Sequence, residues 1–138
     1  MLLVLDSNEY IFALSSIRDP ICVTLLEKIV EYSDKISLRI PRFIVEEVRN
    51  NLTTEAFKEF IISINKLTRT DEDIFVPFEI GAKYESLGLK PADAFIAAYT
   101  EWVGADALVT ENRHFLSRSK DLPFKIFTAK ECLKLIKK

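Results

Sequence analysis

The sequence predicts an α/β protein in which helices cover both faces of a parallel, doubly wound β-sheet. Short apolar segments alternate along the chain with segments of helical periodicity, which is typical of such folds. The opening run Met1–Leu5 shows no polar alternation and therefore indicates a strand buried on both faces. A length of 138 residues fits one compact domain, residues 1–138, with its own hydrophobic core.

The predicted strands are the apolar segments 1–5, 36–40, 74–78, 107–110 and 124–127. Pro77 restricts the third of these to a sheet edge or shortens it, because proline cannot donate a ladder hydrogen bond. Asp19-Pro20 and the pair Thr128/Glu131 are signals for the start of a helix. The predicted helices cover residues 8–16, 20–30, 43–52, 54–67, 79–87, 91–103 and 129–136.

The composition, with 49% hydrophobic and 29% charged residues, is that of a soluble globular protein. The apolar stretches are far shorter than the roughly 20 residues of a membrane span. No secretory signal is visible. Cys22 and Cys132 lie in apolar surroundings and are expected to be reduced and buried, which favours a cytoplasmic location.

The net charge of −2 gives no whole-molecule basic field that would attract nucleic acid. The C-terminal segment Arg113–Lys138 is nevertheless rich in Lys and Arg. Such a run is usually a solvated face, although basic residues beside a cluster of acids could also hold a phosphate backbone. The sequence leaves both interpretations open.

Polar side chains directly follow the first predicted strand. Asp6, Ser7 and Asn8 stand at its carboxyl end, where ligands bind in open α/β sheets. Asp6 or Ser7 is equally suited to cap the helix that follows. The fourth strand ends in the same way, since Glu111 and Asn112 follow it. If that strand continued, their side chains would point to opposite faces.

Two predicted helices carry further candidate acids. Glu47 falls at the rim of the apolar face of helix 43–52, whereas Glu46 points to solvent. Asp93 lies in the first turn of the helix opened by Pro91, where the helix dipole alone would favour an acid. It lies beside small alanines, away from the predicted buried face, which comprises Phe95, Ile96, Tyr99 and Trp102.

A doubly wound sheet would bring Asp6, Glu47, Asp93 and Asn112 to one edge, because each lies at a strand end or near a helix start. Carboxylates in one cleft repel each other unless a cation holds them. With a single His and no Cys cluster, the ligands are hard oxygens, which favour Mg²⁺ or Mn²⁺ over Zn²⁺. Such sites commonly perform hydrolysis at phosphorus, with the metal activating water.

In order and spacing, these segments resemble the motifs of PIN domains, including VapC-type toxins. The similarity rests on Leu5-Asp6-Ser7-Asn8, Glu47-Val48, the run PADAFIAA at 91–98 and the run LVTENRHF at 108–115. The resemblance implies a three-layer α/β/α sandwich with a five-stranded parallel sheet. It also implies a Mg²⁺- or Mn²⁺-dependent endoribonuclease acting on RNA phosphodiesters.

By position, the resemblance makes Asp6, Glu47 and Asp93 the catalytic and metal-binding acids. Asn112 stands where the family often has a fourth Asp, so it is an optional further ligand and should weaken a second metal site. The resemblance also implies an antitoxin partner and a homodimer. The supporting polar residues are Ser7, Asn8, Thr110 and Asn112.

Some residues admit a purely structural interpretation. His114, with Phe115, is expected to pack in a turn rather than to act chemically. The aromatic residues Tyr10, Phe12 and Trp102 are expected in the core, although they could stack on bases. Phe57, Phe60 and Ile61 could pack in a dimer contact or in the core.

Two other functions compete with the nuclease. A degenerate PIN-like module would bind RNA or protein without cleavage, and Asn112 is the feature that favours it. An aspartate-dependent phosphotransferase or receiver domain would also carry an Asp at the end of its first strand. A phosphatase of that kind would normally have a second Asp at the position of Asn8.

Overall fold

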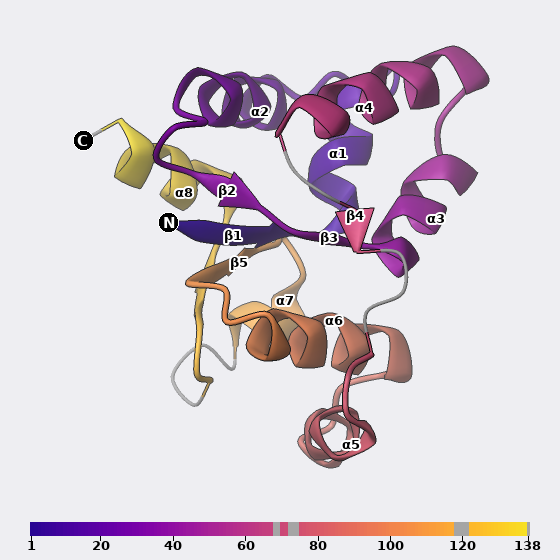
Figure 1. Cartoon of the computed structure of the whole chain (residues 1–138), viewed down its shortest axis with the longest axis vertical. Helices are drawn as coiled ribbons and strands as arrows, with labels where there is room; N and C mark the ends of the chain where they lie inside the picture. The colour runs from indigo at the N-terminus through magenta and orange to yellow at the C-terminus, as the bar shows by residue number, and fades with distance from the viewer. Residues whose placement is uncertain (68–69, 72–74, 118–121, 138) are drawn as a thin grey trace.

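The computed structural model describes residues 1–67, 70–71, 75–117 and 122–137 (Figure 1). The strands are β1 (Leu2–Leu5), β2 (Ser37–Leu38), β3 (Ile40–Pro41), β4 (Thr70–Asp71), β5 (Ala107–Val109) and β6 (Lys125–Phe127). The helices are α1 (Ser7–Leu14), α2 (Pro20–Glu31), α3 (Arg42–Asn50), α4 (Thr54–Leu67), α5 (Phe78–Ser86), α6 (Pro91–Trp102), α7 (Arg113–Leu116) and α8 (Ala129–Ile136).

The central sheet has the strand order β2-β1-β5-β6, and its strands run parallel. Strand β1 is paired on both sides, with Leu3 opposite Leu38 of β2 and Ala107 of β5. Leu3 and Val4 are completely buried, which confirms the prediction of a strand covered on both faces. The carboxyl ends of β1 and β5 therefore lie side by side.

Helices cover both faces of this sheet. In Figure 1, α1, α2 and α4 lie above the sheet, α6 and α7 lie below it, and α5 packs on the outer side of α6. The three-layer α/β/α arrangement expected from the sequence is therefore confirmed.

The expectation of five strands in this sheet is wrong, since the part of the chain that the structure describes contributes four. The predicted strand 36–40 is divided into β2, which pairs with β1, and β3, which pairs with β4 in a separate two-stranded sheet. The predicted strand 74–78 does not form: residues 75–77 are irregular and Phe78 begins α5, while Ile74 lies outside the described residues. Pro77 has no N–H for a ladder, but it fits directly before a helix.

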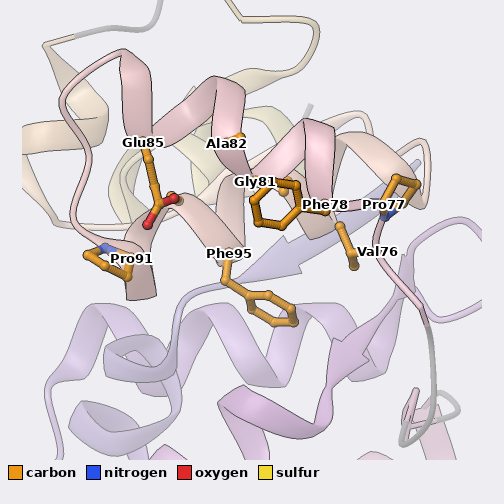
Figure 2. A pocket seen from close by; sticks show the side chains of 10 residues that line it. Val76, Pro77, Phe78, Gly81, Ala82, Glu85, Pro91 and Phe95 are labelled. Carbon is orange, nitrogen blue, oxygen red and sulfur yellow. The ribbon is translucent and has the colours of Figure 1, made fainter.

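Helix α6 is buried on nearly all sides because it lies between the sheet and α5. Ala94, Ala97 and Ala98 are buried, and the small side chains of Ala94 and Ala98 lie on the side that faces α5. The prediction that Trp102 belongs to the buried face is wrong, because this last residue of the helix is 49% exposed. Figure 2 shows the cavity of about 210 Å³ that remains between α5 and α6, with Phe95 on its α6 side.

The predicted helix starts are present. The Asp19 carboxylate caps α2 by accepting hydrogen bonds from the backbone N–H groups of Ile21 and Cys22. Thr128 and Glu131 form the expected capping box at the start of α8. These local signals set the helix boundaries independently of the tertiary contacts.

Helix α4 contributes to the core through one side of its surface. Phe60 is 1% exposed and packs edge-to-face on Tyr10, with ring centroids 5.1 Å apart. Phe57 and Ile61 are partly buried against the same core. Phe60 therefore belongs to the core of the single chain, and a dimer contact through this helix stays a prediction.

Two expectations from the composition concern the thiols and the membrane. Cys22 and Cys132 are free and buried, as predicted. The longest helix among the described residues, α4, has 14 residues, whereas a membrane span needs about 20. Over the described ranges, no helix has the length and apolar character needed to cross a membrane.

Two isoleucines of α4 test the packing of this helix. Ile64 is 2% exposed and Ile62 is 58% exposed. We expect Ile64→Ala to lower the free energy of unfolding by about 2–5 kcal/mol, because it leaves a cavity in the core. The control Ile62→Ala should change it by less than about 0.5 kcal/mol in urea unfolding. Equal losses would contradict the placement of this helix.

Candidate active site

The polar residues that follow β1 and β5 line one open cavity of about 410 Å³. It lies at the carboxyl ends of these two parallel strands, the usual ligand position in such sheets. Helices α3 and α6 add one carboxylate each, so the structure brings Asp6, Glu47 and Asp93 around the same space. The cavity is lined by Asp6, Ser7, Asn8, Phe12, Glu47, Ala92, Asp93, Ile96, Glu111 and Asn112.

Asp6 both caps α1 and lines the cavity. Its interpretation as a helix cap is therefore compatible with its interpretation as a site residue. Its Oδ1 accepts a hydrogen bond from the Ser7 backbone N–H at 2.8 Å. Its Oδ2 accepts one from the Thr110 hydroxyl at 2.7 Å. Burial raises the pKa of Asp6 and the charge of Asp93 adds to the rise, whereas the hydrogen bonds from Thr110 and Ser7 oppose it.

Glu47 reaches the cavity because the apolar face of α3 is fixed in the core. Ile44 and Val48 of this face are completely buried. Glu47 is half-buried at its edge and lines the cavity. The neighbouring Glu46 forms long ion pairs, of 3.8 and 3.9 Å, with two exposed arginines.

Asn112 lies at the end of the segment after β5 and contacts Asp93. Its Oδ1 accepts a hydrogen bond from the His114 backbone N–H at 2.9 Å and thereby caps α7. This bond fixes the orientation of the amide, because only Oδ1 can accept. Nδ2 then donates to Asp93 Oδ2 at 3.3 Å. Asn112 thus presents a donor to the acid, and its oxygen is already engaged.

The donor set suits a hard divalent cation. The pKa of Glu47 is raised, first by desolvation and then by the charges of Asp6 and Asp93, while a hydrogen bond from Ser7 opposes the rise. A bound cation would relieve this repulsion between carboxylates. Within the described residues, however, no three His, Cys, Asp or Glu side chains are grouped as a finished metal site.

Two acids near this cavity were not among the predicted site residues. Glu9 is completely buried in α1, one turn after Asp6, and burial beside Glu111 raises its pKa to about 9. Its helical spacing from the buried Ala13 could have indicated that it faces inward. Glu111 lines the cavity together with Asn112, because β5 ends at Val109 and strand alternation no longer applies.

The other residues singled out in the sequence lie outside this cavity, with the exception of Phe12. His114 is exposed on α7, whereas Phe115 is completely buried, which agrees with a packing role for the turn. Tyr10 is in the core, and Phe12 is the aromatic residue that lines the cavity. The described basic residues of the C-terminal segment are exposed and do not line it: Arg113, Lys125, Lys130, Lys134 and Lys137.

Three solved structures share this fold. VapBC2 from Rickettsia felis, solved bound to a DNA fragment from its promoter, has a TM-score of 0.62 and 19% identity, covering 91% of this chain and 98% of that chain. FitAcB from Neisseria gonorrhoeae has a TM-score of 0.63 and 16% identity, and the match covers 93% of this chain and 98% of that chain. PAE2754 from Pyrobaculum aerophilum has a TM-score of 0.62 and 19% identity, and the match covers 99% of this chain and 98% of that chain.

These likenesses extend over nearly the whole length of both chains in each pair. No protein-family model matches the sequence, and no curated protein matches it either. At this low sequence identity, the structural likeness establishes a shared fold only.

The hydrogen bond from Thr110 to Asp6 can be tested by Thr110→Val, which keeps the shape and removes the hydroxyl. The same hydroxyl also accepts a hydrogen bond from the Asn112 backbone N–H at 3.0 Å. Because the variant loses this bond as well as the one to the carboxylate, we expect a loss of about 2–3 kcal/mol in the free energy of unfolding near neutral pH. The control Thr100→Val removes a buried hydroxyl that donates to the Ile96 carbonyl at 2.7 Å. Thr100→Val should lower the free energy of unfolding by about 1 kcal/mol. Equal costs in urea unfolding would contradict the special role of Thr110.

The buried Glu9 predicts a pH dependence of stability. Its folded-state pKa of about 9 lies above the ordinary value of 4.5, so folding takes up a proton between these two values. Stability contributed by this group is therefore lost as the pH rises through that window. Relative to Glu9→Gln, which cannot titrate, the wild type should lose roughly 1 kcal/mol per pH unit within it. A pH-independent difference in urea unfolding would contradict this assignment.

Proposed function

We propose that this protein is a divalent-metal-dependent endoribonuclease of the PIN-domain type, similar to VapC toxins. The observation that carries the proposal is the meeting of Asp6, Glu47 and Asp93 around one cavity at the carboxyl ends of two parallel strands. The shared fold with VapBC2 and FitAcB supports it. The sequence motifs that resemble PIN domains contain these same acids.

In this proposal Asp6, Glu47 and Asp93 hold Mg²⁺ or Mn²⁺. When bound, the cation would activate a water for attack on an RNA phosphodiester and neutralise phosphate charge. Thr110 keeps Asp6 in place through its 2.7 Å hydrogen bond. Asn112 donates to Asp93 and adds no charge of its own. Ser7 and Asn8, the other two polar residues predicted to support the site, line the same cavity.

A VapC-like toxin would act in the cytoplasm with an antitoxin partner, and we propose both for this chain. We also propose a homodimer, in line with the resemblance. The cavity is open to solvent at the sheet edge, and acids dominate its polar lining. A phosphate backbone would be repelled there until a cation is bound, so metal binding is expected to precede RNA binding.

One second function has a specific observation in its favour. Asn112 is neutral and its oxygen caps α7, and the described acids are not closed into a finished metal site. Both features would suit a PIN-like module that binds RNA or protein without cleavage. A phosphotransferase has no such support, because Asn8 stands where a phosphatase of that kind would normally have a second Asp.

Two adjacent glutamates of α3 provide a matched test of the nuclease. With Mn²⁺, the purified protein should cleave single-stranded RNA. Glu47→Gln should lower the cleavage rate by about 100-fold or more, because it removes a carboxylate from the metal site. Glu46→Gln, at the neighbouring position that does not line the cavity, should retain the wild-type rate. Equal rates would contradict the proposal.

The binding module is separated from the nuclease by Mn²⁺ titration of the wild type, followed by thermal unfolding. A rise in melting temperature that is lost in Asp6→Asn would support the nuclease. RNA binding with no such rise would favour the binding module.

A further inference from the structure

Part of the lining of the candidate active-site cavity is apolar, and the proposed metal chemistry assigns no role to it. Phe12, Ala92 and Ile96 line the same cavity as the acids, and Phe12 is the aromatic residue of this lining. Phe12 is partly buried against the core, whereas Ile96 is only 2% exposed. An aromatic side chain therefore borders the space around the carboxylates.

The position of Phe12 is fixed by the packing of α1, which lies against both α2 and α3. The Phe12 carbonyl accepts a hydrogen bond from the backbone N–H of Asp19, the N-cap of α2, at 2.8 Å. Phe12 lies one turn after Asn8 on the same face of α1, and Asn8 also lines the cavity. A well-anchored helix therefore presents Phe12 to the cavity.

The ring of Phe12 pairs with no other aromatic ring among the described residues. The ring contacts in this part of the chain join other side chains. Since Phe12 is also only partly buried, its ring is available to a flat ligand in the cavity. Stacked aromatic rings gain free energy beyond that of burying their area.

The two other aromatic residues considered for base stacking do not border the acids. Tyr10 is 2% exposed and belongs to the core. Trp102 is 49% exposed, but it is the last residue of α6, and Asp93 lies in the first turn of this helix. At 1.5 Å per residue, the two are about 14 Å apart along the helix axis. Phe12 therefore combines partial exposure with a place beside the carboxylates.

A nucleotide carries the two kinds of surface that this cavity can bind. Its phosphate is anionic and suits a cation held by the acids. Its base is a flat ring that stacks on aromatic side chains when it is not stacked in a duplex. Phe12 follows Asp6 by about 9 Å along α1. One or two nucleotides of a single strand can span this separation.

We propose that Phe12 is a specificity-determining residue that stacks on the base of a nucleotide at or next to the phosphate bound by the acids. The site would then take single-stranded RNA, because the bases of a duplex are paired and stacked on each other. Stacking tolerates every base, so Phe12 sets the preference for single strands and little preference among bases. The identity of the ligand rests on the proposed nuclease function.

A binding experiment that needs no cleavage tests the stacking. Glu47→Gln serves as the parent protein, because it is expected to leave RNA intact. With Mn²⁺ present, fluorescence anisotropy compares a short single-stranded RNA with an abasic strand of the same length, which keeps the phosphates and lacks the bases. The parent should bind the base-bearing strand roughly 5-fold or more tightly, as stacking on an aromatic side chain predicts.

Variants of the parent assign this preference to the ring. Phe12→Leu keeps an apolar side chain and removes the ring, so it should bind both strands with similar affinity. Phe12→Tyr keeps the ring and should keep the preference. The control Trp102→Ala, which removes an exposed aromatic residue outside the cavity, should also keep it. If Phe12→Leu does not fold, Phe12→Met takes its place, because it also lacks a ring.

An unchanged preference in the variant without the ring would overturn the stacking role, as would a parent that binds both strands equally or neither. Cleavage of RNA by the wild type decides the nuclease function separately. A wild type that does not cleave, combined with a preference that is lost with the ring, would overturn the nuclease and retain Phe12 as a stacking residue of a binding module.

Discussion

Electrostatic repulsion between carboxylates is the constraint around which the active-site region is organised. Asp6, Glu47 and Asp93 surround one cavity, and the pKa of both Asp6 and Glu47 is raised by burial and by neighbouring acids. Such an arrangement costs stability in the absence of a cation. The scaffold must therefore hold these groups in place against their mutual repulsion, and each acid is anchored differently.

Among the described residues, the side-chain partners of Asp6 and Asp93 are neutral hydrogen-bond donors. Thr110 donates to Asp6, and Asn112 donates to Asp93. Both donors belong to the segment that follows β5, which makes this short stretch a common support for two acids from distant parts of the chain. Lys or Arg at these positions would neutralise the acids and compete with a metal ion. Neutral donors orient the carboxylates and leave their charge available.

The rigid core explains how distant segments can position these groups. Strands β1 and β5 are paired in parallel, so Asp6 and Thr110 emerge at the same edge of the sheet. Ile44 and Val48 lock α3, which brings Glu47 to the cavity. Ala94 and Ala97 allow α6 to be enclosed, with Asp93 in its first turn. The functional groups stand on elements whose other faces are buried, which favours a pre-organised site.

The sequence alone determined the α/β class, the start of α2 at Asp19-Pro20 and the candidate acids, because these depend on local periodicity, capping and strand ends. The tertiary structure decided what depends on neighbours. Packing against α5 buried Ala98 and left Trp102 exposed. The predicted strand 74–78 did not form over residues 75–78, so the described part of the central sheet has four strands. The complete burial of Glu9 depends on the packing of α1 against α2 and of α2 against α8, which are contacts between segments far apart in the sequence.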